Sequence, residues 1–226
     1  MPKGIWIFAF LGLLGGGGFQ AAFGQEIEER IRAIDEQQQK IQTLIAHFTQ
    51  IKETSLVKEP LVSSGLVRFK RPDFIRWTYL KPEAMEVVLD GQTIRVYHGE
   101  HSQVEEYSLT RNKIVARYLE PLIGVFQHPF TQLTKVYRMT YEGLEGQRTF
   151  HFHLQPKAKE VQKFLAGVDL WIDKDSGAIL RFKMVEANGD RLILEFHNLQ
   201  LNPSMNEEDL KGKISLPQRG LGENGS

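Results

Sequence analysis

The sequence predicts a mainly β protein: an incomplete antiparallel β-barrel of about eleven strands, its open side covered by a long N-terminal helix and an inserted helical lid. After Pro60, eleven short runs alternate apolar and polar residues with a period of two. Turn residues separate nearly all of these runs, which favours antiparallel pairing of consecutive strands. Because so many strands exceed what a flat open sheet tolerates, we expect the sheet to curl.

The first element is predicted to be a helix over residues 26–48. Its apolar residues are spaced by three, four or seven, and charged residues occupy the other face, which is typical of an amphipathic helix. These apolar residues are Ile27, Ile31, Ile34, Ile41, Ile45 and Phe48. A free coiled coil is the alternative, although only three heptads precede the β pattern. The helix therefore needs an apolar surface on which to lie.

The strand series shows its alternation most clearly where Val67 and Phe69 are interleaved with Arg68 and Lys70. Asp90-Gly91 is one of the separating turns, a pair typical of tight hairpins. The predicted strands are 61–70, 73–80, 85–90, 93–98, 103–109, 135–142, 147–155, 164–173, 177–187, 190–200 and 212–217.

Residues 112–130 interrupt the strands with an apolar stretch that Pro121 divides, and we interpret it as one or two short helices. Its candidate lid residues are Leu119, Leu122, Ile123 and Phe126. A fully closed barrel would leave this lid and the N-terminal helix no apolar face to cover. The incomplete barrel is the simpler solution.

The chain begins with the layout of an export signal over residues 1–24: one cation, Lys3, a short apolar run, and small residues at Ala22 and Gly24. A retained N-terminal anchor is the alternative. We expect one domain over 25–217 and a flexible tail over 218–226. Without the leader, 27 basic side chains (28 minus Lys3) face 28 acidic ones. This near neutrality argues against a nucleic-acid partner.

Catalytic and metal-binding motifs are weak in this sequence. We therefore expect that the protein is not an enzyme and that it binds no cofactor or metal. His98 and His101 lack a third ligand, and the loop that begins at Asp173 has Met184 where a calcium loop needs a bidentate glutamate. The sequence contains no G-x-S-x-G motif, phosphate loop or cysteine.

Large apolar residues recur on one face of every predicted strand. The alternation alone does not separate a packed core from a ligand cavity. The number of strands favours a cavity, because eight strands already enclose an interior that is just filled or holds a small ligand.

The strand motifs resemble those of LolA, the periplasmic outer-membrane lipoprotein carrier family. The resemblance covers nearly all of the chain after the leader. It is carried by Phe48-Thr49-Gln50, the run from Phe69 to Trp77 (FKRPDFIRW), Lys81-Pro82, Val88 to Gly91, Ile94 to Tyr97, Leu154 to Lys157, Asp173 to Gly177 and Glu186 to Asp190.

The resemblance implies a monomeric periplasmic carrier that receives lipoproteins from an inner-membrane ABC exporter and passes them to an outer-membrane acceptor. It also implies that Arg71 is the latch that binds carbonyls of the lid helices when the carrier is empty. Trp77 matches the family's tryptophan, whereas Ile75 stands where an aromatic residue is more usual.

The expected cavity and mouth residues are Phe69, Ile75, Trp77, Met85, Val87, Leu89, Ile94, Val96, Phe152, Leu170, Phe182 and Leu194. A packed core tryptophan at 77 and a rim ion pair at Arg71 are the plainer interpretations. Alternative functions are a carrier of another lipid or glycolipid, a lipoprotein sensor and, least favoured, a periplasmic lipid hydrolase.

Overall fold

The computed structural model describes residues 16–98, 104–111, 121–206 and 209–210. Its helices are α1 (Gly16–Gln39), α3 (Phe130–Val136) and α4 (Lys159–Gln162), and residues 121–127 are also helical. The strands are β1 (Thr43–Glu53), β2 (Leu61–Lys70), β3 (Phe74–Lys81), β4 (Met85–Asp90), β5 (Thr93–His98), β6 (Val104–Ser108), β7 (Tyr137–Glu145), β8 (Thr149–Pro156), β9 (Leu165–Asp173), β10 (Ile179–Glu186) and β11 (Arg191–Leu201).

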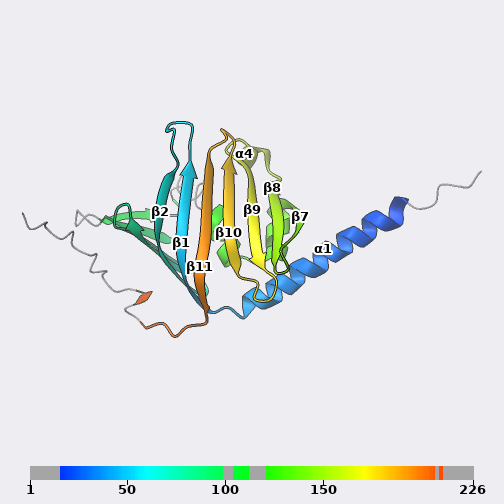
Figure 1. The fold of residues 1–226 in the computed structure, drawn as a ribbon, viewed down its shortest axis with the longest axis horizontal. Coiled ribbons are helices and arrows are strands. Elements are labelled where there is room, and N and C mark those ends of the chain that lie inside the picture. The colour runs from blue at the N-terminus through cyan, green and yellow to red at the C-terminus, as the bar shows by residue number, and fades with distance from the viewer. Residues whose placement is uncertain (1–15, 99–103, 112–120, 207–208, 211–226) are drawn as a thin grey trace, which may run out of the picture.

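These strands form one sheet in the order β6-β5-β4-β3-β2-β1-β11-β10-β9-β8-β7, with every neighbouring pair antiparallel. Strands β6 and β7 are the two edges, and the sheet curls without joining them (Figure 1). The predicted incomplete antiparallel barrel is confirmed.

The predicted helix over residues 26–48 is wrong in its last part. Helix α1 ends at Gln39, and β1 begins at Thr43. Leu44, Ala46 and Phe48 are buried at alternate positions, with more exposed residues between them, which is the period of a strand. Thus Phe48-Thr49-Gln50 lies within β1 and does not end a helix. The predicted strand 212–217 and the tail 218–226 lie outside the described residues.

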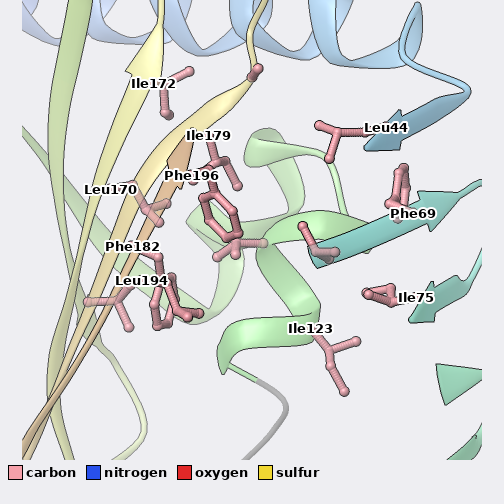
Figure 2. Packing of buried hydrophobic residues seen from close by; sticks show 14 of the residues in the cluster. Leu44, Phe69, Ile75, Ile123, Leu170, Ile172, Ile179, Phe182, Leu194 and Phe196 are labelled. Atoms are coloured by element: carbon pink, nitrogen blue, oxygen red, sulfur yellow. The ribbon is translucent and has the colours of Figure 1, made fainter. Parts of the chain in front are cut away.

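The interior of the sheet is a continuous apolar core (Figure 2). Its largest fully buried side chains include Phe48, Phe130, Phe152 and Phe182. Ile31 and Ile34 of α1 belong to the same cluster, so the C-terminal half of the helix covers part of the core. Among the described helices, none combines the length and apolar character needed to cross a bilayer.

The two ends of the sheet differ. At the α1 end, the helix packs on the β9–β10 turn, where Gly177 has φ +71 and a Cβ would lie 3.0 Å from the Ile34 carbonyl oxygen. At the opposite end, which we call the α4 end, lie α4 and the β1–β2 and β10–β11 connections (top of Figure 1). The cavity described next lies near α4.

Candidate functional site

A cavity of about 590 Å³ lies at the α4 end, between the helical residues 121–127, α3, the start of β7 and α4. Its lining is mainly apolar, with a few polar side chains at the rim. The lining residues are Leu109, Pro121, Gly124, His128, Leu133, Lys135, Val136, Tyr137, Pro156, Lys157, Ala158, Glu160, Val161 and Phe164. Cavities of about 300–1,000 Å³ with this character accommodate small apolar ligands.

Helix α3, which forms one wall of the cavity, is held by a side chain of α1. The buried Asp35 carboxylate accepts hydrogen bonds from the backbone N–H groups of Phe130 (2.5 Å) and Thr131 (3.0 Å) and from the Thr131 hydroxyl (2.7 Å). Because the first N–H groups of a helix have no partner within it, this carboxylate supplies the missing cap. Asp35 therefore ties the N-terminal helix to the helical cover.

Arg71 forms a second tie, at the α1 end. Its Nε donates to the Ile41 carbonyl oxygen at 2.8 Å, and a terminal nitrogen donates to the Gln38 carbonyl oxygen at 2.9 Å. Burial lowers the pKa of the guanidinium from its ordinary value. The described hydrogen bonds of Arg71 thus go to the end of α1 and the residues after it. A latch function stays a prediction.

The inserted lid approaches Arg71 across a small cleft of about 30 Å³, which Phe69, Val125 and Phe126 also line. The Phe126 ring makes edge-to-face contacts with Trp77, at a centroid distance of 6.0 Å, and with Phe196, at 5.8 Å. Ile123 is buried and Leu122 half-buried against the core, whereas Leu119 lies outside the described residues.

The structure places the expected cavity residues in the packed core or at its margin. None of these twelve residues lines the 590 Å³ cavity, and only Phe69 lines the small cleft. Nine are buried: Phe69, Ile75, Trp77, Leu89, Ile94, Phe152, Leu170, Phe182 and Leu194. The half-buried ones are Met85, Val87 and Val96. These expected cavity residues therefore pack within the described core or at its margin, and the 590 Å³ cavity lies elsewhere, beside α3 and α4.

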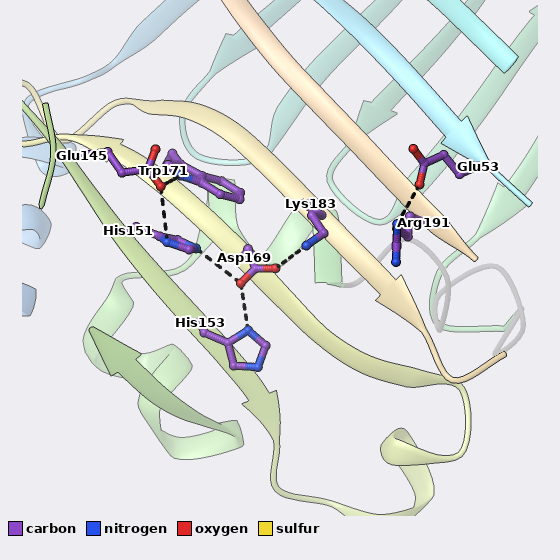
Figure 3. A network of polar contacts seen from close by, with 8 residues as sticks. All are labelled: Glu53, Glu145, His151, His153, Asp169, Trp171, Lys183 and Arg191. Carbon is purple, nitrogen blue, oxygen red and sulfur yellow. Dashed lines mark hydrogen bonds and ion pairs between the residues drawn. The ribbon is translucent and has the colours of Figure 1, made fainter. Parts of the chain in front are cut away.

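A polar cluster occupies the outer face of β7–β10, on the side of the sheet opposite the core (Figure 3). This outer network comprises Glu145, His151, His153, Asp169, Trp171 and Lys183. The His151 ring stacks on Trp171 at 4.3 Å, and both His151 and His153 lie close to the Asp169 carboxylate, so the two histidines are held within the network.

Asp169 is the centre of the outer network. It accepts hydrogen bonds from His153 Nδ1 at 2.8 Å and from Lys183 Nζ at 3.2 Å. Burial by itself raises the pKa of this carboxyl, but the bonds from His153 and Lys183 outweigh it and hold the pKa below its ordinary value. The network joins four adjacent strands, β7 to β10, and none of its residues lines the cavity.

Sequence reasoning missed the α3–α4 part of the site. The sequence did contain a signal, in the lysine-rich segment 156–164. Its apolar residues Val161 and Phe164 are three positions apart, which is the spacing of one helix face. These two side chains pack against the core from α4 and from just beyond it.

Comparison with known proteins defines the family. The family model described as outer membrane lipoprotein carrier protein LolA matches residues 39–211. The chain belongs to the LolA family. An outer-membrane lipoprotein carrier protein of Albidiferax ferrireducens is 24% identical over 211 residues, which are 89% of each chain.

Solved structures support the fold. An uncharacterized conserved protein from Thermus thermophilus superposes with a TM-score of 0.52 at 15% identity, covering 84% of this chain and 96% of that one. The structure of the MucA/MucB complex of Pseudomonas aeruginosa gives a TM-score of 0.50 at 17% identity, covering 82% of this chain and 60% of the matched one. At these identities the likeness concerns the fold alone.

Proposed function

We propose that this chain is a periplasmic carrier that shields the acyl chains of lipoproteins and moves them from an inner-membrane exporter to the outer membrane. It acts as a binding protein and not as an enzyme. The observation that carries the proposal is the mainly apolar 590 Å³ cavity between the helical residues 121–127, α3 and α4 of a LolA-family barrel. The relatives named outer-membrane lipoprotein carrier proteins support the same cargo.

The physical need for such a carrier comes from the cost of wetting an acyl chain. Each methylene removed from water contributes about 0.8 kcal/mol, so one long chain costs on the order of 10 kcal/mol to expose. An apolar cavity offsets most of that cost during transfer. The 590 Å³ cavity is the starting space, and movement of residues 121–127 would expose further apolar surface at Trp77, which the Phe126 ring now contacts.

One tie lies close to those residues, because Asp35 holds the start of α3, which follows them. Arg71 holds the end of α1 and the segment after it, and its described hydrogen bonds do not reach residues 121–127. We propose that the carrier has closed and open states, and that the ligand shifts the population toward the open one. In this proposal Arg71 acts as a latch through the end of α1, and Arg71→Leu would slow delivery to an acceptor.

The cavity can be tested by filling it. Ala158 lines the cavity, whereas Ala166 is exposed on β9 and absent from the lining. Ala158→Trp should weaken binding of a fluorescent sixteen-carbon acyl probe and of a triacylated lipopeptide, while Ala166→Trp should bind both like the unmodified protein. Equal binding by the two variants would show that the acyl chain does not bind in this cavity.

Cargo and activity need a second readout. Native mass spectrometry of the purified protein should show a bound acylated peptide after incubation with the lipopeptide. A preference for glycolipid or phospholipid over the lipopeptide would favour the alternative lipid carriers. A deacylated product would indicate a hydrolase and contradict the proposed function.

A further inference from the structure

Exposed apolar side chains gather at one end of the molecule. Nine large apolar side chains among the described residues are exposed, and by strand order seven of them lie at the α4 end. These seven are Leu56, Val57, Leu61, Val62, Leu80, Val104 and Val136. The other two, Leu144 and Leu201, lie in the last residues of β7 and β11, toward the α1 end.

The β1–β2 connection forms the apex of this surface. Leu56 is 89% exposed, and Val57, Leu61 and Val62 are each about half exposed. Leu80, at the end of the adjacent strand β3, extends the surface sideways. So large an exposed fraction on consecutive apolar residues marks an interaction surface, because scattered single residues are the usual case.

The apex is held in place by the neighbouring hairpin. Asp190, between β10 and β11, accepts hydrogen bonds from the Thr54 hydroxyl and the Ser55 backbone N–H, both at 3.0 Å. Below them, Arg191 pairs with Glu53 at 3.2 Å. The fold thus fixes the base of the connection while presenting Leu56 and Val57 to solvent.

The shape and charge of this end favour a lipid surface over a protein partner. The apolar side chains project from a hairpin tip and are spread over separate elements, an arrangement that suits insertion into a bilayer interface. Lysines exceed acidic residues around α4, where Lys157, Lys159 and Lys163 are exposed against Glu160, while at the tip Lys58 is balanced by the exposed Glu59. Anionic headgroups attract such a lysine-rich margin.

We propose that the α4 end docks on the membrane surface, with Leu56 and Val57 inserted among the headgroups of an anionic bilayer. This docking would bring the mouth of the 590 Å³ cavity, which Val136 and Lys157 line, to the lipid from which cargo leaves or into which it enters. The docking goes beyond cargo binding and requires no cargo.

The first test is flotation of purified protein with vesicles of phosphatidylethanolamine and phosphatidylglycerol. Leu56→Asp should lower the partition coefficient about tenfold, since burial of one leucine is lost. Leu144→Asp introduces the same charge at an exposed leucine near the opposite end and should leave partitioning unchanged. Residues 1–24 are identical in all three proteins, so their contribution cancels from the comparison.

The second test uses the absence of cysteine from the chain. An environment-sensitive fluorophore on Leu56→Cys should shift to shorter wavelength and brighten on addition of the same vesicles, whereas the fluorophore on Leu144→Cys should not. Failure of the unmodified protein to float, equal flotation of the two aspartate variants, or equal response at the two labelled positions would each overturn membrane docking. Acyl-probe binding is measured separately, so these outcomes leave the carrier proposal standing.

Discussion

Arg71 offers the most direct test of how the cover is held closed. Arg71→Leu keeps an apolar stem but removes both hydrogen bonds to the carbonyl oxygens of Gln38 and Ile41. Hydrogen bonds that involve a charged group contribute about 1.5–3 kcal/mol each. Arg71 is only half-buried, and water can replace part of what is lost. We therefore expect the free energy of unfolding to fall by about 2 kcal/mol in total.

The assay combines urea denaturation with amide hydrogen exchange. The stability loss should appear in the denaturation midpoint, and exchange should rise first around the backbone bonds of Lys40 to Gln37 and Ile41 to Gln38. Arg71→Lys should recover only part of the lost stability. Lysine keeps a charged donor, but its ammonium lacks the planar guanidinium that reaches both carbonyl oxygens.

The matched control is Arg138→Leu. Arg138 is exposed on the edge strand β7, and its hydrogen bond to Gln155 is long, at 3.5 Å. Its loss should change stability by no more than about 0.5 kcal/mol. If Arg71→Leu and Arg138→Leu have the same stability and the same exchange near residue 40, Arg71 does not hold the end of α1.

Three further predictions concern the remaining ties and the outer network. Asp35→Ala should destabilise the protein by about 1–3 kcal/mol in urea, because α3 loses its cap and buried N–H groups lose their acceptor; an unchanged midpoint would contradict this tie. Gly177→Ala should lower Tm more than Gly189→Ala, since both glycines have positive φ but only Gly177 packs against α1; equal shifts would show that α1 does not press on this turn. Asp169 has a folded-state pKa below its unfolded value of about 3.9, so its stabilisation is complete above that pH and is lost as pH falls through the folded pKa. Asp169→Asn should therefore show a smaller further loss of stability between pH 5 and about pH 2 than the unmodified protein, and parallel curves would refute the assignment.

Alternation along the chain was sufficient to predict most of the sheet. The predicted strand 61–70 coincides with β2, and 85–90 and 93–98 coincide with β4 and β5. The predictions for these segments were correct because one face of each strand is buried and turn residues mark the strand ends. The curl of the sheet followed from the number of strands.

The end of the first helix could not be predicted in the same way. Ile41, Ile45 and Phe48 satisfy the spacing of a helix, while Leu44, Ala46 and Phe48 satisfy that of a strand. Pairing of β1 with β2 on one side and β11 on the other decides between the two patterns. The pairing of β1 with β11 joins residues about 150 positions apart, as with Thr49 and Glu195, and leaves no local signal in the sequence.

The position of the cavity was also beyond local patterns. Phe152 and Phe182 alternate like cavity residues but are sealed in the core, whereas the open space lies beside α3 and α4. Its location depends on Asp35 capping a helix 95 residues away. A contact of this kind follows from tertiary packing and not from periodicity.

The central claim is that this LolA-family chain recognises its cargo by burying acyl chains. Calorimetric titration of the purified protein with a triacylated lipopeptide and with the same peptide lacking acyl chains tests it most directly. We predict binding of the acylated peptide with a negative heat-capacity change, and no measurable binding of the deacylated one. Equal affinity for the two peptides, or binding of neither, would contradict the claim.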